Sequence, residues 1–174
     1  YEDEAVVAAE KPSGIPSVPG LDGRTSIFES LKEKYVDLYT VHRLDMDTSG
    51  VILFAKTSEA AVNLQKQFEN HTIRKTYHAR LSASAEGRIL NIGDKGKIEL
   101  PLSPDYDERP RQKVDISQGK EAITEYEVIS VDKDGTTKIS YYPLTGRTHQ
   151  LRVHSAHILG LGKPIVGDML YGGS

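Results

Sequence analysis

A run of ionisable and hydroxyl side chains separates two apolar segments in the first third of the chain. It reads TVHRLDMDTSG and is followed at once by VILFAK. Asp45 and Asp47 lie two positions apart in this run, and carboxylates at a strand end can act as nucleophile, general acid or general base. The segment is therefore a candidate catalytic loop. Its other candidates for contact with a substrate are His42, Arg43 and Thr48.

Structural roles compete with catalysis at each of these positions. The run Asp47-Thr48-Ser49-Gly50 could be an ordinary turn in which Asp47 accepts backbone N–H groups, and Arg43 with Asp45 could be a structural ion pair. Two carboxylates could also serve a glycosidase-like hydrolase, whose carboxyl groups stand about 5–9.5 Å apart. A binding module that has lost catalysis is a further alternative. A kinase is excluded because the chain lacks the glycine-rich loop and the other kinase motifs.

A second polar segment, GRTHQLR, occupies residues 146–152. The planar guanidinium of Arg147 could hold a carboxylate by two parallel hydrogen bonds; the alternative is a solvated loop arginine before an ordinary helix. Histidines at 149, 154 and 157 do not have the spacing of a zinc site, and the chain has no cysteine. We therefore expect no metal and no cofactor.

Length and composition favour a soluble cytoplasmic protein of one domain. The chain has 174 residues, 27% of them charged, and a formal net charge of −3. No apolar run approaches the ~18 residues of a membrane span. The negative total argues mildly against a polyanionic ligand, but the last thirty residues hold Arg147, Arg152 and Lys163 against Asp168 alone. A polyanion could thus bind to one face.

The periodicity of apolar residues and the turn signals predict an α+β fold with many strands and three helices. Strands are expected at 5–9, 51–55, 73–81, 88–92, 97–100, 121–131 and 136–142, the last two joined by the turn DKDG. Helices are expected from Ser26 towards Tyr35, from Thr57 or Ser58 to Phe68, and over 148–159. Residues 103–119 are expected to form a long charged loop. The sheet should be largely antiparallel.

Five segments resemble, in order, motifs of the RluA-type pseudouridine synthases. They are KPSGIPSVPG, VHRLDMDTSGVILFAKT, KTYHA, LTGRTHQLRVH and GKPIVGDMLYG. The segments RPRQKV and GKEAITEYEV further resemble the subgroup that acts on both ribosomal and transfer RNA. The resemblance implies a pseudouridine-synthase-like catalytic domain, a mostly antiparallel mixed sheet flanked by a few helices. It also implies an isomerase that detaches a uridine at N1, rotates the base and rejoins it through C5, with no cofactor.

The resemblance assigns roles to particular residues. Asp45 is the nucleophile or base, Tyr77 packs against the uracil, and Arg147 pairs with Asp45. Arg43 helps to displace the target base from its stack, which costs a few kcal/mol. The remaining residues expected to bind substrate are His42, Thr48 and His149.

Three cations of the long loop, Arg109, Arg111 and Lys113, are candidates for phosphate contact. A solvated charged loop is the alternative, because acidic residues are interleaved with them. We expect residues 1–174 to form a single catalytic domain, truncated at the C-terminus and without a separate RNA-binding domain. Its partner would be a structured RNA, a stem-loop of ribosomal or transfer RNA, with no membrane and no obligate protein partner.

Overall fold

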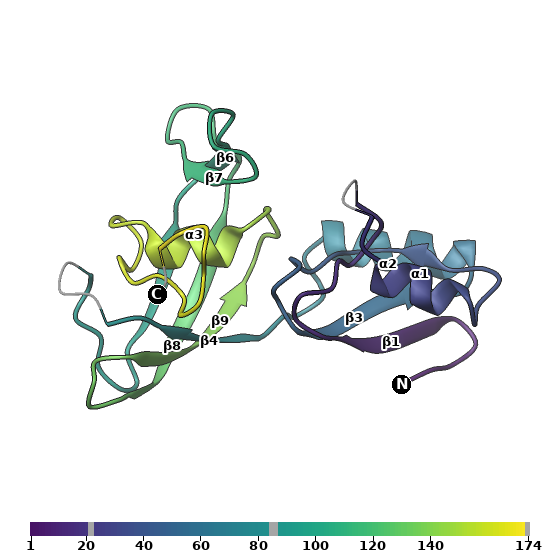
Figure 1. Ribbon diagram of the computed structural model, residues 1–174, viewed down its shortest axis with the longest axis horizontal. Helices are drawn as coiled ribbons and strands as arrows, with labels where there is room; N and C mark the ends of the chain where they lie inside the picture. The colour runs from purple at the N-terminus through teal and green to yellow at the C-terminus, as the bar shows by residue number, and fades with distance from the viewer. Residues whose placement is uncertain (21–22, 84–86, 173–174) are drawn as a thin grey trace. The chain divides into compact units, whose positions relative to one another are not determined.

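The computed structural model describes residues 1–20, 23–83 and 87–172 (Figure 1). The chain divides into two compact units, Tyr1–Ile73 and Arg74–Ser174. Each unit combines antiparallel strands with one or two helices. The predicted α+β class is therefore confirmed, and the prediction of a single catalytic domain stays a prediction.

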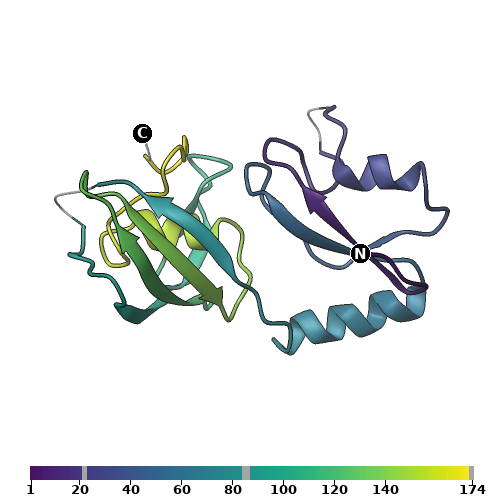
Figure 2. The ribbon, with the colours of Figure 1, turned by 90° about the horizontal axis from the view of Figure 1, so that it is seen from below.

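The first unit is a three-stranded antiparallel sheet covered by two helices (Figure 2). Its strands are β1 (Val6–Lys11), β2 (Tyr39–Thr40) and β3 (Gly50–Ala55), in the order β1-β3-β2. Alternation places Ile52 and Phe54 of β3 on the covered face, where both are fully buried. The ring of Phe28 from helix α1 (Ile27–Lys32) lies 6.0 Å from that of Phe54. This contact fixes α1 on the sheet.

Both helices of the first unit begin where the sequence predicts. Ser26 accepts from the backbone N–H of Glu29, whose carboxylate accepts in return from the backbone N–H of Ser26. This capping box starts α1. Thr57 accepts from the Ala60 N–H and so caps α2 (Ser58–Glu69).

The second unit holds a four-stranded antiparallel sheet with a helix across one face (Figure 1). The strands are β4 (Tyr77–Leu81), β9 (Thr137–Pro143), β8 (Ile123–Val131) and β5 (Lys95–Glu99), in that order across the sheet. The helix is α3 (Gln150–Ala156), whose Leu151 packs against the core. Among the largest fully buried core side chains are Leu81, Val128, Ile139 and Tyr141. A separate hairpin pairs β6 (Leu102–Pro104) with β7 (Gln112–Val114).

Four predictions about elements need correction. Residues 88–92 form no strand; the Arg88 N–H instead donates to the Leu161 carbonyl, and β5 pairs with β8. The expected loop at 103–119 contains most of the β6–β7 hairpin. Strand β4 begins only at Tyr77. Helix α3 ends at Ala156 because His157 adopts an extended backbone with ψ 137°.

Candidate active site

The loop that carries Asp45 is fixed on both sides of that residue. The hydroxyl of buried Ser17 donates to the Leu44 carbonyl (2.6 Å) and accepts from the Leu44 N–H (3.0 Å). The Met46 carbonyl accepts from the Gly14 N–H at 2.9 Å. The backbone before and after Asp45 is thus tied to the segment that follows β1. Asp45, itself half-buried, is held by its neighbours.

A fully buried lysine supplies another tie to the same loop. Lys11 lies at the end of β1 with no exposed surface, and its ammonium donates three hydrogen bonds. Their acceptors are the carbonyl oxygens of Pro12 (2.9 Å), Ile15 (2.7 Å) and Met46 (2.8 Å). Burial lowers the pKa of Lys11, and the charges of Asp47 and Asp45 oppose this effect. The ammonium therefore combines hydrogen bonding with electrostatic attraction towards the aspartate loop.

We expect Lys11→Met to loosen this loop. Three acceptors would lose a charged donor, which should lower the free energy of unfolding by about 2–4 kcal/mol. Hydrogen exchange of the Gly14 and Leu44 amides, together with urea unfolding, measures the effect. Lys32→Met is the matched control, because the Lys32 ammonium donates to the Val36 carbonyl on the exposed surface. Unchanged exchange at Gly14 and Leu44 would show that Lys11 does not hold the loop.

The structure tests the two structural alternatives for the residues around Asp45, a turn and an ion pair between Arg43 and Asp45. The Thr48 N–H donates to the Asp45 carbonyl at 3.1 Å, so the turn spans residues 45–48, two residues earlier than expected, and Asp47 is exposed on it. Arg43 is exposed as well and forms no ion pair with any residue that the structure describes. The alternative of a structural Arg43–Asp45 ion pair is therefore wrong.

His42 has a structural contact on each side of its ring. Its Nε2 accepts from the Leu53 N–H of β3 at 2.8 Å, so the proton of a neutral ring lies on Nδ1. The ring stacks on Phe68 of α2 with centroids 4.7 Å apart. These contacts orient the start of the aspartate loop, and substrate contact by His42 stays a prediction.

The second unit fixes Arg147 through a buried glutamine that the sequence analysis missed. The Gln150 side-chain carbonyl accepts from the Arg147 N–H (2.9 Å) and the Thr145 hydroxyl (2.8 Å). Its amide donates to the Ile123 carbonyl and the Thr124 hydroxyl of β8. All four hydrogen-bonding positions are thus used. The Arg147 side chain is exposed, and its Nε donates to the carbonyl of Glu121 at 2.9 Å.

Tyr77 and His149 occupy different environments in the second unit. Tyr77, half-buried at the start of β4, lies opposite Tyr141 of β9 and packs against the core. His149 is buried in a left-handed conformation (φ 54°), and its Nδ1 lies 2.8 Å from the Tyr171 hydroxyl. The Tyr171 hydroxyl also accepts from the Gln112 N–H at 2.8 Å. His149 is therefore tied both to the segment after α3 and to strand β7.

A buried ion pair holds the segment after α3 to that helix. The Arg152 Nε and Nη2 donate to the two Asp168 carboxylate oxygens, both at 2.7 Å, and the side chains are 13% and 4% exposed. Asp168 also accepts from the backbone N–H groups of Leu170 and Tyr171. Burial acts to raise the pKa of Asp168, but the hydrogen bonds and charge of Arg152, together with the backbone N–H groups of Leu170 and Tyr171, outweigh it and the pKa is lowered. Asp168 is the only acidic residue among the last thirty of the sequence, where Arg152 also lies, and this was the sequence signal for the pair.

Each candidate cation of the β6–β7 hairpin already has a partner within the second unit. Arg109 lies over the Tyr106 ring, with its guanidinium carbon 5.1 Å from the centroid. Arg111 is paired with Glu108, and Lys113 lies 3.7 Å from Asp105. These contacts favour the alternative of a solvated charged loop, so phosphate contact by these residues stays a prediction.

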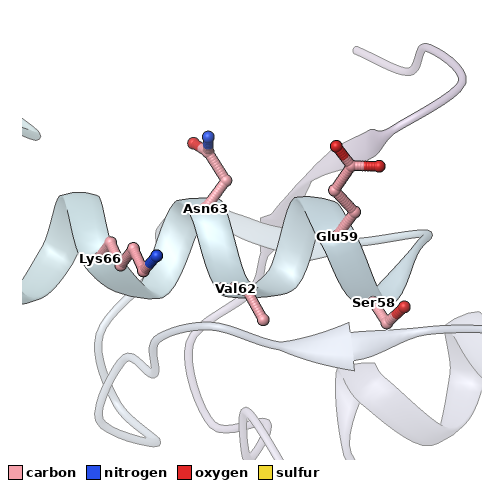
Figure 3. A pocket seen from close by; sticks show the side chains of 5 residues that line it. All are labelled: Ser58, Glu59, Val62, Asn63 and Lys66. Atoms are coloured by element: carbon pink, nitrogen blue, oxygen red, sulfur yellow. The ribbon is translucent and has the colours of Figure 1, made fainter.

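An open hollow of about 420 Å³ lies along helix α2, and no predicted site residue lines it (Figure 3). Its lining comes from one helix alone: Ser58, Glu59, Val62, Asn63 and Lys66. Within residues 1–20, 23–83 and 87–172, no group of three or more His, Asp or Glu side chains could hold a metal ion. In the same ranges no helix is long and apolar enough to cross a membrane.

Comparison with known proteins decides the family. The family model described as RNA pseudouridylate synthase matches residues 5–157. The chain belongs to the RNA pseudouridylate synthase family. The matched region contains Asp45, Tyr77 and Arg147, and the predictions of this family and of an isomerase that acts on RNA are confirmed.

Relatives of this pseudouridylate synthase share much of its sequence. The dual-specificity RNA pseudouridine synthase RluA of Yersinia pestis is 44% identical over 98% of this chain and 80% of its own length. The protein of the same name from Escherichia coli K12 is 41% identical over 98% of this chain and 75% of its own. The solved structure of human RNA pseudouridylate synthase domain containing 1 matches with a TM-score of 0.78 and 27% identity, over 99% of this chain and 68% of its own.

Proposed function

We propose that this synthase converts specific uridines of ribosomal RNA, transfer RNA or both to pseudouridine, within stem-loops. The observation that carries the proposal is the identity of 41–44% over 98% of the chain to relatives named dual-specificity RNA pseudouridine synthases. These relatives are bacterial proteins, and bacteria make these RNAs in the cytoplasm, so we propose that this synthase works there. The bond from ribose C1′ to uracil N1 breaks, the base rotates, and a bond from C1′ to C5 replaces it. The C5 proton leaves and N1 gains one, so the atoms balance without a cofactor.

We further propose Asp45, Tyr77 and Arg147 as the catalytic residues. Asp45 acts as nucleophile or base; an ordinary aspartate is already ionised at neutral pH. Its support is the loop geometry, in which Ser17 and Lys11 hold the backbone on both sides of the carboxylate. Tyr77 offers a ring for stacking on uracil and a hydroxyl for a hydrogen bond.

Gln150 holds the backbone N–H of Arg147, and the Glu121 carbonyl accepts from its guanidinium; both contacts support its assignment as the cation for a carboxylate. It lies in a different unit from Asp45, so the pairing of the two stays a prediction. For substrate binding we propose Arg43, which is exposed and can take the place of the displaced base. The other proposed contacts are His42, Thr48, His149, Arg109, Arg111 and Lys113.

A mapping experiment tests the proposal. The protein is incubated with unmodified ribosomal and transfer RNA, and modified positions are located by carbodiimide labelling and primer extension. We expect defined stops at a few uridines and no free uracil. Release of uracil would favour the glycosidase alternative, and binding without any modified position would favour the RNA-binding module.

A further inference from the structure

The second unit contains a half-buried lysine, Lys75, whose charge is balanced by no carboxylate of the described residues. Lys75 donates one hydrogen bond, from Nζ to the Thr145 carbonyl at 3.2 Å. Within the described ranges its ammonium has no other hydrogen-bond partner and no ion pair. Burial lowers the pKa of Lys75, and no charge among the described residues opposes this effect. A partly desolvated cation of this kind is best stabilised by an anion, and two of its three N–H donors remain for one.

The surroundings of the ammonium leave room for that anion. Gly146 follows Thr145, and a methyl group placed on it would lie 3.8 Å from the Lys75 Nζ. Apart from its chain neighbours, this methyl group would meet no other described atom within 4 Å. On the side of Gly146, the space next to the ammonium is therefore not filled by other described atoms.

The position of Lys75 relates it to the catalytic residues proposed for this unit. Lys75 precedes Tyr77 by two residues, and both are half-buried in an alternating pattern of exposure. The carbonyl that it contacts belongs to Thr145, two residues before Arg147. An anion bound to Lys75 would thus lie beside the backbone that presents Arg147. The substrate RNA carries one phosphodiester per nucleotide, and lysine binds phosphate as a point charge.

We propose that Lys75 binds a backbone phosphate of the RNA next to the target uridine. The inference rests on the proposed function and adds a binding residue to it. Gly146 is part of the same site, because its missing side chain leaves the approach to the ammonium open. Lys75 acts in substrate binding and takes no part in the isomerisation step.

The test compares Lys75→Met, which keeps length but removes charge, with Lys75→Arg. Dissociation constants for an unmodified transfer RNA transcript are measured across a series of salt concentrations. For Lys75→Met we expect about tenfold weaker binding, and a salt slope reduced by about 0.7–0.9. The single-turnover rate at saturating RNA should not change, and Lys75→Arg should restore most of the affinity. Lys133→Met is the control, because Lys133 is exposed at the opposite end of β9 from Thr145.

Three outcomes would overturn the inference. The first is an unchanged salt slope in Lys75→Met, and the second is an equal reduction in Lys133→Met. The third is a lowered melting temperature with unchanged affinity, which would place the counter-ion of Lys75 inside the protein. If the wild type forms pseudouridine in the transfer RNA, these outcomes leave the proposed function standing. If the wild type forms pseudouridine in neither RNA, the proposed function fails instead, whatever the salt slope.

Discussion

Asp45→Asn should abolish pseudouridine formation while the fold and the affinity for RNA stay close to those of the wild type. Asparagine keeps the shape of the side chain but removes the negative charge and the nucleophilic oxygen. Loss of a nucleophile or essential base lowers turnover by a factor on the order of 10⁴ or more. Single-turnover release of tritium from 5-tritiated uridine in RNA measures the rate, because the C5 proton leaves in the reaction.

The control for this experiment lies in the same turn. Asp47 is exposed, so Asp47→Asn should retain activity within a few-fold of the wild type. Equal losses in both variants would support a mechanism with two carboxylates, as in the glycosidase alternative. Measurable turnover by a carefully purified Asp45→Asn protein would remove Asp45 from the proposed catalytic residues.

Arg152→Met should be the most destabilising single change in the second unit. It leaves the Asp168 carboxylate buried without its cation, which costs about 3–5 kcal/mol in comparable buried pairs. The double variant Arg152→Met with Asp168→Leu should recover much of this loss, because neither charge is then buried. Urea unfolding followed by circular dichroism measures both. A loss below 1 kcal/mol in Arg152→Met would show that the pair is not important for stability.

An exposed ion pair of the same unit provides the comparison. The Arg80 Nη2 lies 3.0 Å from an Asp132 carboxylate oxygen, with side chains 59% and 52% exposed, so Arg80→Met should cost at most about 1 kcal/mol.

The stabilisation by the buried Arg152–Asp168 pair should also depend on pH. Because the pKa of Asp168 is lowered in the folded state, its contribution is complete above the ordinary value of 3.8 and is lost as pH falls below it. Stability of Asp168→Asn should therefore depend less on pH in that range.

Local signals predicted the elements that depend on local structure. The capping residues Ser26 and Thr57 fixed the helix starts, and the turn DKDG correctly indicated the β8–β9 hairpin. The strand expected at 88–92 was wrong and the pairing of β5 with β8 was not predicted, because alternation predicts a strand but not which distant strand pairs with it. The early end of α3 depends on the backbone turn at His157, which no periodic pattern of apolar residues reports.

In the candidate site, too, the sequence predicted what local motifs carry and not what depends on contacts between distant residues. The motifs identified the family and hence the residues proposed for chemistry, and the comparisons confirmed the family. The residues that hold them in place were missed, because Ser17, Lys11 and Gln150 act through backbone groups far along the chain. One signal was present: the period of two along β1 places Lys11 on the same face as buried Val7. A lysine on a core-facing position has to find acceptors inside the protein.

The four bonds of Gln150 also limit how this position can vary in evolution. Glutamate would keep the acceptor for Arg147 and Thr145 but lose both donors to β8, while leucine would satisfy none of them. Histidine and asparagine are too different in reach to span the same partners. A deep mutational scan should therefore find position 150 almost intolerant of substitution, and a natural sequence that departs from glutamine here should carry compensating changes at positions 123–124 and 145.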